Sequence, residues 1–188
     1  MQEPQQIQLN VFDCQSEETR KQCESFAARL ETVYRNRATT EADMKTTQQE
    51  SEMVDFQLTT EAIKDIQKFY GQSFIDEKNI LIEVAEKVPA MIDEARKLVR
   101  ERESECETAF NTIKADLDPI GLPFTNENQE SFFIRGSKRY REFENHAGEA
   151  RNFETSANQV NSGTRRRIEW LNWKAIQLKN KLLGPSLV

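Results

Sequence analysis

One apolar stripe runs through residues 81–117, in steps of three and four, for more than five heptads. Its members are Leu81, Val84, Val88, Met91, Ile92, Ala95, Val99, Arg102, Cys106, Ala109, Ile113 and Leu117. Such spacing places every member on one side of an α-helix and is typical of a helix that packs lengthwise against others. The stripe therefore predicts a long helix over about 76–117, packed as in a coiled coil.

A similar stripe predicts a first helix over about 16–70, with a polar interruption in its middle. Apolar side chains dominate its seam except over 37–51, where the seam positions become mostly polar: Arg37, Thr40, Met44, Thr47 and Ser51. Polar seam positions lower stability, so this stretch is expected to set register, receive a partner or open the bundle. Gly71 is expected to end the helix, because glycine is the usual residue just past a helix C-terminus.

The third expected helix spans about 127–183 and follows the proline- and glycine-rich breaker 118–123. Its expected seam consists of Tyr140, Phe143, Ala147, Ala150, Phe153, Ala157, Asn161, Thr164, Ile168, Leu171, Ala175, Leu178 and Leu182. A candidate interruption lies at 161–163, where Gly163 follows two polar residues. Gly184 and Pro185 are expected to end the helix.

Together these patterns predict an all-α fold, an elongated antiparallel three-helix bundle of coiled-coil type that occupies residues 16–183. Residues 1–15 are expected to form an extended N-terminal arm, because 6–11 alternate polar and apolar side chains, and 184–188 a short tail. Pro89 should kink the second helix near Glu86, since proline lacks an N–H and clashes with the preceding turn. A helical hairpin whose remaining helix pairs with other chains is the alternative architecture.

Charge and cysteine usage narrow the function classes. The net charge of −6 divides into −5 over 1–72, −5 over 73–118 and +4 over 119–188, so the last third can attract the rest of the bundle. Cys14, Cys23 and Cys106 are odd in number and form no C-x-x-C pair, which disfavours a disulfide framework or a zinc site. Reduced thiols are expected, in the cytoplasm or the nucleus. Neither a signal peptide nor a membrane-spanning segment is expected.

Catalytic motifs are missing from the sequence. His146 is the single histidine, and its E-x-x-x-H spacing from Glu142 is not the E-x-x-H spacing of di-iron bundles. No glycine-rich phosphate-binding motif occurs. We therefore expect no enzyme activity, no metal and no cofactor.

The segment 164–183 is basic and holds both tryptophans. If its leucines face the seam, helical geometry places the tryptophans nearly opposite, among basic side chains. The residues expected on this aromatic and basic face are Arg166, Trp170, Trp173, Lys174 and Lys181. Tryptophan and arginine are the side chains most enriched at protein-binding hot spots, although internal contacts, for example with Phe132 and Phe133, could also cover the face.

These observations predict a non-enzymatic scaffold or tethering subunit of a cytoplasmic protein assembly. Its partners would be other protein subunits, in a homo- or hetero-oligomer, bound through helical seams and the C-terminal face. The alternative is a peripheral membrane protein that lays this basic face on anionic lipid. Nucleic acid is the weakest candidate, because the sequence pI is about 5.1.

Overall fold

The computed structural model describes residues 2–7, 9, 17–51 and 56–183. Four α-helices follow one another: α1 (Glu17–Ser51), α2 (Phe56–Leu117), α3 (Glu127–Gly136) and α4 (Lys138–Leu183). A short 3₁₀ turn, η1 (Asp118–Ile120), follows α2. The all-α prediction is therefore confirmed.

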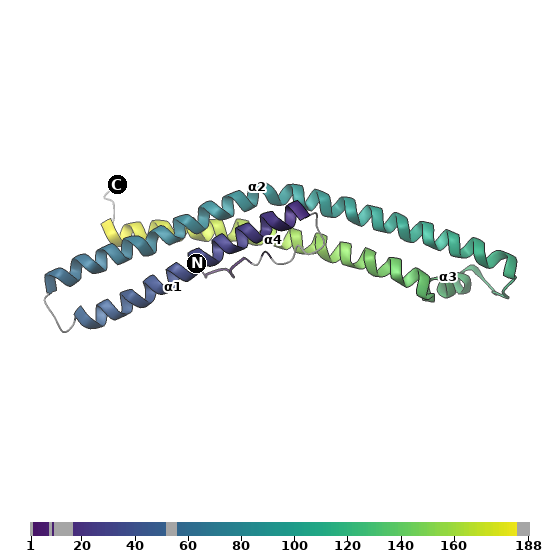
Figure 1. The fold of residues 1–188 in the computed structure, drawn as a ribbon, viewed down its shortest axis with the longest axis horizontal. Coiled ribbons are helices and arrows are strands. Elements are labelled where there is room, and N and C mark those ends of the chain that lie inside the picture. Colours follow the sequence, from purple (N-terminus) through teal and green to yellow (C-terminus); the bar gives the residue numbers. More distant parts are fainter. Residues whose placement is uncertain (1, 8, 10–16, 52–55, 184–188) are drawn as a thin grey trace.

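The helices form a bowed rod with two different halves (Figure 1). Helices α2 and α4 run antiparallel along the whole rod, and α1 lies antiparallel to the first half of α2. Contacts from Thr19 to Glu94 and from Arg37 to Ser73 set the α1–α2 register. Of the helices that the structure describes, α1, α2 and α4 thus lie in one half of the rod, and α2, α4 and, at its end, α3 lie in the other. The end of the rod formed by η1, α3 and the neighbouring turns is called the tip below.

Two predicted helix boundaries are wrong. The break between the first two helices falls between Ser51 and Phe56, and Gly71 lies inside α2 without a positive φ. The second break falls at Ser137, whereas α4 continues unbroken through 161–163. Ser137 adopts an extended conformation and its Oγ accepts a hydrogen bond from the Tyr140 N–H, which caps the start of α4. The predicted end of the second helix at Leu117 agrees with the structure, while the tail at 184–188, with Gly184 and Pro185, lies outside the described residues.

Helix α2 is bent near its middle (Figure 1), and Pro89 lies in this part of the helix. Proline removes one backbone hydrogen bond and crowds the preceding turn, so a bend here has a local cause. The side chain at Pro89 is exposed, and the neighbouring Val88 is fully buried on the inner side. The bend therefore shapes the rod without interrupting its core.

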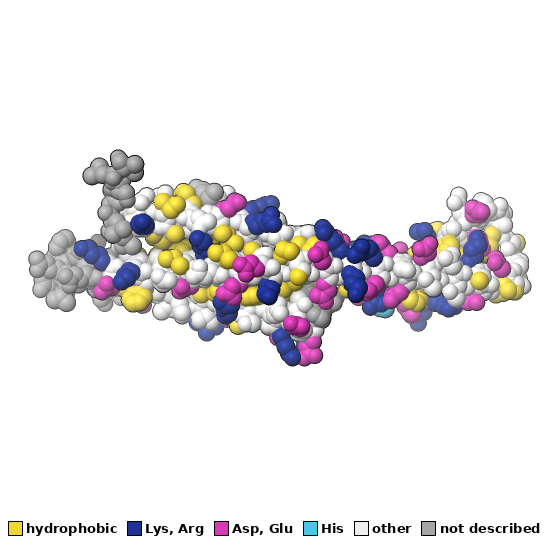
Figure 2. All heavy atoms as spheres, turned by 90° about the horizontal axis from the view of Figure 1, so that it is seen from above, with side chains coloured by type: hydrophobic (Ala, Val, Ile, Leu, Met, Phe, Trp, Pro, Cys, Tyr) yellow, Lys and Arg dark blue, Asp and Glu magenta, His cyan; other side chains and the backbone are white. Residues whose placement is uncertain are grey.

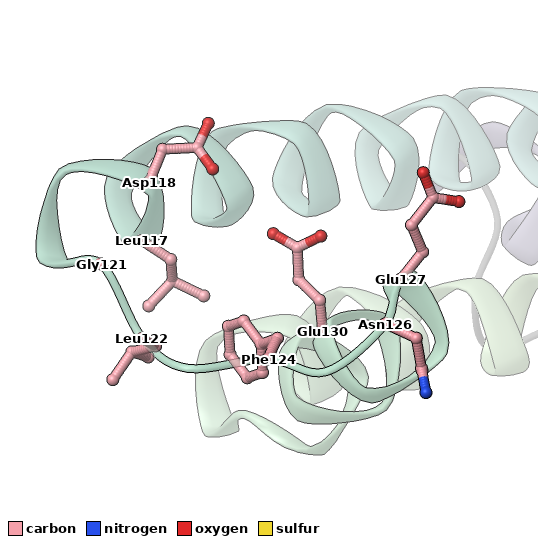
Figure 3. A pocket seen from close by; sticks show the side chains of 8 residues that line it. All are labelled: Leu117, Asp118, Gly121, Leu122, Phe124, Asn126, Glu127 and Glu130. Carbon is pink, nitrogen blue, oxygen red and sulfur yellow. The ribbon is translucent and has the colours of Figure 1, made fainter.

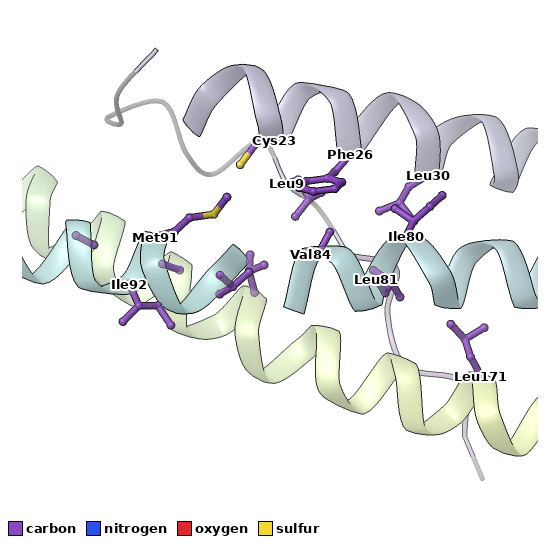
Figure 4. Close-up of a cluster of buried hydrophobic side chains, with 14 of the residues drawn as sticks. Leu9, Cys23, Phe26, Leu30, Ile80, Leu81, Val84, Met91, Ile92 and Leu171 are labelled. Carbon is purple, nitrogen blue, oxygen red and sulfur yellow. The ribbon is translucent and has the colours of Figure 1, made fainter. Parts of the chain in front are cut away.

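The main core lies in the three-helix half and joins α1, α2, α4 and the N-terminal arm. Its buried apolar members are Leu9, Cys23, Phe26, Leu30, Phe74, Ile80, Leu81, Val84, Val88, Met91, Ile92, Ala95, Phe153, Ala157, Val160, Trp170 and Leu171. Figure 4 shows Leu9 of the arm beside Phe26 of α1, facing Val84 of α2. A second, smaller cluster at the far end holds Ile113, Ile134 and Tyr140.

The N-terminal arm contributes to this core although it has no helix or strand in its described part, 2–7 and 9. The Ile7 Cδ1 atom lies 3.1 Å from the position that a Cβ atom would take at Gly163. Glycine at this position therefore lets the arm approach the backbone of α4 closely. This is a packing role, in contrast to the helix break that the sequence suggested. Of the arm predicted over 1–15, residues 1, 8 and 10–15 lie outside the described residues.

On the face drawn in Figure 2, hydrophobic side chains gather over the three-helix half, and mixed charges cover most of the other half. No described helix combines the length and hydropathy needed to cross a bilayer.

Candidate functional site

A buried ion network lies at the centre of the three-helix half. The carboxylate of Glu77 on α2 has no exposed surface, and it accepts hydrogen bonds from Arg37 of α1 (2.6 Å) and Arg167 of α4 (2.7 and 3.3 Å). Tyr34 Oη donates a further bond of 3.1 Å to the same carboxylate. Arg37 also donates to the hydroxyl and carbonyl oxygens of Ser73, both at 2.9 Å. One carboxylate thus connects all three helices.

The arm completes this network. Arg167 Nη1 donates to the carboxylate of Glu3 and to the carbonyl oxygen of Pro4, both at 2.9 Å. Burial by itself would lower the pKa of the Arg167 guanidinium, but its hydrogen bonds to Glu77, the charge of Glu77 and the hydrogen bond to Glu3 together outweigh burial and raise the pKa. Burial, and then the Glu77 charge, raise the pKa of the Tyr34 hydroxyl above its usual range. Tyr34 is therefore a neutral donor at physiological pH, and Arg167 stays charged.

Aromatic rings cover the two guanidinium groups. The Arg37 Cζ atom lies 3.9 Å from the ring centre of Phe74, and the Arg167 Cζ atom lies 4.5 Å from that of Trp170. The two rings are themselves in contact, with 5.9 Å between centroids. Such cation–π stacking favours a buried guanidinium because the ring face is electron-rich. The charged groups of this arrangement are paired internally, whereas the buried Nε1 of Trp170 has no hydrogen-bond partner. Paired buried charges are the pattern of a structural connection more than of a reactive centre.

The five residues predicted on the C-terminal face do not form one exposed surface. Trp170 is 4% exposed and belongs to the core, so its assignment to an open face is wrong. Lys174 is half-buried, with its Nζ atom 5.8 Å from the ring centres of Phe74 and Trp170. Trp173 is 37% exposed, and Arg166 is exposed as well. Lys181 lies outside the side chains that the structure describes.

Trp170 is buried because of the way α4 packs. Its buried seam runs through Val160, Thr164, Arg167 and Leu171, with Lys174 half-buried, instead of through Asn161, Ile168 and Ala175. In this half α4 meets both α2 and the arm, so a wider arc of the helix is covered. That arc includes Trp170, which a single narrow seam would leave outside.

Helix α3 is well fixed at the tip. Asn126 caps it through a 2.9 Å bond from the Gln129 N–H, and the Gln129 side chain accepts from the N–H and hydroxyl of Thr125 (2.9 and 2.7 Å). Ile134 is its fully buried anchor, packed with Ile113 and Tyr140. This short helix therefore presents its remaining side chains in a defined orientation.

Large apolar side chains are exposed at the tip: Ile120 is 65%, Leu122 37%, Phe132 82% and Phe133 51% exposed. We call these four residues the tip patch. The rings of Phe124 and Phe133 are in contact, with 5.6 Å between centroids. Phe124, Phe132 and Phe133 line an open hollow of about 600 Å³ whose rim includes Arg141.

A second hollow of about 300 Å³ lies between α2 and α3. Figure 3 shows the ring of Phe124 in the space between these helices and the carboxylates of Glu127 and Glu130 directed toward α2. Glu130 forms a 3.0 Å ion pair with Lys114 there. The acidic groups of α3 are thus on the α2 side, in the same hollow that Asp118 and the tip-patch residue Leu122 line. Among the described residues, no three His, Cys, Asp or Glu side chains are placed to hold a metal ion.

No known family matches the sequence, and no curated protein or solved structure is significantly similar to the chain. Function must therefore be argued from the surfaces described above.

The sequence analysis missed both the ion network and the tip patch. A signal for the network existed: Glu77 precedes Leu81 by four residues, and Arg167 precedes Leu171 by four, so both fall in register with buried seams. Opposite charges at seam positions of facing helices indicate a buried pair. For the tip, the adjacent aromatic residues Phe132 and Phe133 were visible, but the sequence alone offered them only as internal cover.

Proposed function

We propose that this protein is a non-enzymatic scaffold or tethering subunit that docks onto other protein subunits through the outer side of α4. The observation that carries this proposal is the exposure of Trp173 (37%) and Ile176 (57%), one turn apart on α4. Arg166 is exposed two turns before Trp173 on the same side of the helix. We call Arg166, Trp173 and Ile176 the α4 outer face.

The composition of this face suits a protein contact. Tryptophan and arginine dominate the energetics of many interfaces, because each buries a large area and retains a polar group. The half-buried Lys174 extends the face toward the core. Other subunits, in a homo- or hetero-oligomer, are the partners that such a surface would take.

The shape of the molecule supports a spacing role. The start of α4 at Lys138 lies beside the tip, and Trp173 lies 35 residues further along the same helix. At the usual rise per residue this corresponds to about 50 Å. A rod that exposes apolar side chains at two well-separated places can hold two binding partners apart.

The non-enzymatic part of the proposal has its own support. His146 is exposed on α4, and the polar cluster around Glu77 is saturated by internal hydrogen bonds. Burial, and then the charge of Glu24, raise the pKa of the Cys23 thiol to about 11, so it stays protonated and is a poor nucleophile. We place the protein in the cytoplasm because buried thiols of this kind suit a reducing compartment.

The test compares the wild-type chain with the variant W173S/I176S as bait in extracts of the source cell, followed by reconstitution with the purified candidate subunit. The matched control is Phe69→Ser, which also removes an exposed apolar side chain (70% exposed) but lies on α2. We expect the outer-face variant to weaken the reconstituted complex at least tenfold and the control to leave it unchanged. Equal binding by all three proteins would refute the proposed docking face.

A further inference from the structure

The N-terminal arm is held against the helices by few anchors. Of its described residues, 2–7 and 9, Leu9 is buried, Pro4 and Ile7 are half-buried, and the others are exposed. No described residue of the arm forms a hydrogen bond from its backbone to the backbone of a helix. The bonds from Arg167 to Glu3 and Pro4 hold it instead. The arm is therefore a shallow segment with three apolar anchors and one charged anchor.

This segment lies against two helices that do not contact each other directly. Among the described residues, α1 and α4 each pack on α2, and no close backbone contact joins α1 to α4. On the α1 side, Leu9 lies beside Phe26 (Figure 4). On the α4 side, Ile7 approaches Gly163, one turn before Arg167. We call Phe26, Gly163 and Arg167 the arm seat.

Without the arm, the buried cluster would have an excess of positive charge. The helices supply the guanidinium groups of Arg37 and Arg167 but only one carboxylate between them, that of Glu77. Lys174 adds a further positive charge nearby, since its Nζ atom and the Arg167 Cζ atom both lie over the ring of Trp170. The arm supplies the second carboxylate, so the arm seat favours an anionic occupant.

Two other carboxylates near the cluster do not take this place. Glu41, one turn after Arg37 on α1, forms an ion pair of 3.6 Å with Lys45. Glu169 is exposed, and helical geometry places it nearly opposite Arg167 on α4. The carboxylate that does take it, on Glu3, has a side chain 57% exposed, whereas the Arg167 side chain is fully buried. The anion therefore reaches the guanidinium from the solvent side.

The arm leaves a polar group beside its seat unused. The indole of Trp170 stacks on the Arg167 guanidinium, yet its Nε1 atom is buried and has no hydrogen-bond partner. Buried indole N–H groups usually have one. An incoming segment that offered an acceptor here would gain a hydrogen bond that the described arm residues do not form.

We propose that the arm seat is a docking site for an extended segment of a partner protein, and that the arm occupies this site in the isolated chain. The segment that fits has the chemistry of the arm: a carboxylate for Arg167, an apolar side chain four residues later at Gly163, and another two residues further in the main core. Charge complementarity selects such a partner, because the seat lacks one negative charge when the arm is displaced. The arm then acts as an internal competitor that lowers the apparent affinity for the partner.

This site differs from the α4 outer face. It uses other residues and is tested with substitutions in the arm, so the inference does not depend on the proposed protein contact. Each can fail without the other.

The first experiment measures binding of a fluorescein-labelled peptide with the sequence of residues 2–9 to the full-length chain, by fluorescence anisotropy. In the wild type the arm competes with the peptide, so binding should be weak. In Glu3→Gln the arm loses its charged anchor, and we expect the peptide to bind about tenfold more tightly, since a charge-assisted hydrogen bond accounts for at least that factor. The matched control is Gln5→Ser, which changes an exposed arm side chain and should bind the peptide like the wild type.

Changes in the peptide test the chemistry without affecting the fold of the chain. Peptides that carry the equivalent of Glu3→Gln or of Ile7→Ser should each bind the Glu3→Gln chain at least about fivefold more weakly than the original peptide. In the chain itself, Ile7→Ser should raise the affinity for the original peptide, as Glu3→Gln does. Both positions lie outside the helices, so circular dichroism should show unchanged helicity.

Three results would overturn the inference: no binding of the peptide to Glu3→Gln, equal affinity for this variant and the wild type, or undiminished binding of the peptide that lacks the carboxylate. A wild-type dimer in sedimentation that Glu3→Gln dissociates would assign the arm seat to the arm of a second copy of this chain. The proposed partner segment would then be wrong.

Discussion

At the scale of single residues, Glu77 is the position at which we expect a substitution to lower the stability of the protein most. Its carboxylate is fully buried and accepts hydrogen bonds from Arg37, Arg167 and Tyr34. Burying ions costs solvation energy, so such a cluster adds little net stability compared with apolar side chains of the same volume. The cluster does disfavour every alternative packing of the helices in which a guanidinium group would be buried without a carboxylate partner. We infer that the cluster fixes the register of α1, α2 and α4.

Removing this carboxylate should be costly. In Glu77→Ala two buried guanidinium groups lose their counter-charge, and we expect the free energy of unfolding to fall by about 3–5 kcal/mol. Urea titration monitored by circular dichroism measures this. The matched control is Glu83→Ala, whose partner Arg29 and own side chain are both about half exposed, and its cost should be far smaller because exposed ion pairs contribute little to stability. Equal costs in the two variants would mean that the buried cluster has no special role.

At the scale of elements, short connections in the sequence predicted the antiparallel packing, and the proline- and glycine-rich breaker after Leu117 predicted the C-terminal end of α2. Apolar periodicity predicted the long helices but failed at the seam of α4. The predicted seam passed through Ile168 and Ala175, so helical geometry placed Lys174 on the opposite, aromatic and basic face, and Arg167 was given no role. The compensating charge is 90 residues away in the chain, on Glu77, so it is found only when the seams of α2 and α4 are compared with each other.

The helix boundaries were predicted wrongly at two glycines, because their effect also depends on tertiary packing. Gly71 and Gly163 were interpreted as breaks, yet each lies inside a helix. Glycine in a helix costs about 1 kcal/mol relative to alanine, which a long packed helix tolerates. The actual break at Ser137 depends on a serine cap, a weaker signal in sequence than glycine or proline. At Gly163 the requirement is tertiary, since the arm contacts the helix there.

Two alanine substitutions in α4 separate this tertiary role from helix propensity. Gly148→Ala meets no atom within 4 Å and should stabilise the protein by about 0.5–1 kcal/mol. Gly163→Ala gains the same propensity but brings its Cβ within 3.1 Å of Ile7 Cδ1, so the arm must shift. We expect a smaller stabilisation and faster hydrogen exchange at residues 2–9. The same stabilisation and arm protection in both variants would contradict a close fit of the arm.

At the scale of the whole molecule, the two halves of the rod differ in how they are held together. In the three-helix half, α1 and the arm cover α2 and α4, and most buried apolar residues are found there. Coverage by α1 ends near the contact of Thr19 with Glu94. Beyond it, exposed ion pairs such as Arg96–Glu154 and Glu103–Arg151 flank a thin seam. Exposed pairs contribute little stability, so the half that carries the tip should be the weaker one.

Native-state hydrogen exchange should therefore divide α2 and α4 each into two parts. Amides of 74–95 and 153–171 pack on the main core and should exchange only through global unfolding, whereas those of 100–117 and 138–150 should open at a lower free energy. Both α2 and α4 continue as helices from the protected part into the less protected part, so helix propensity does not explain the change in protection. The point at which α1 stops covering the other helices does explain it. Mass spectrometry of peptides from both halves measures it. Uniform protection along α2 would show that the two-helix half is as stable as the rest, and α1 would then not be the element that divides the rod.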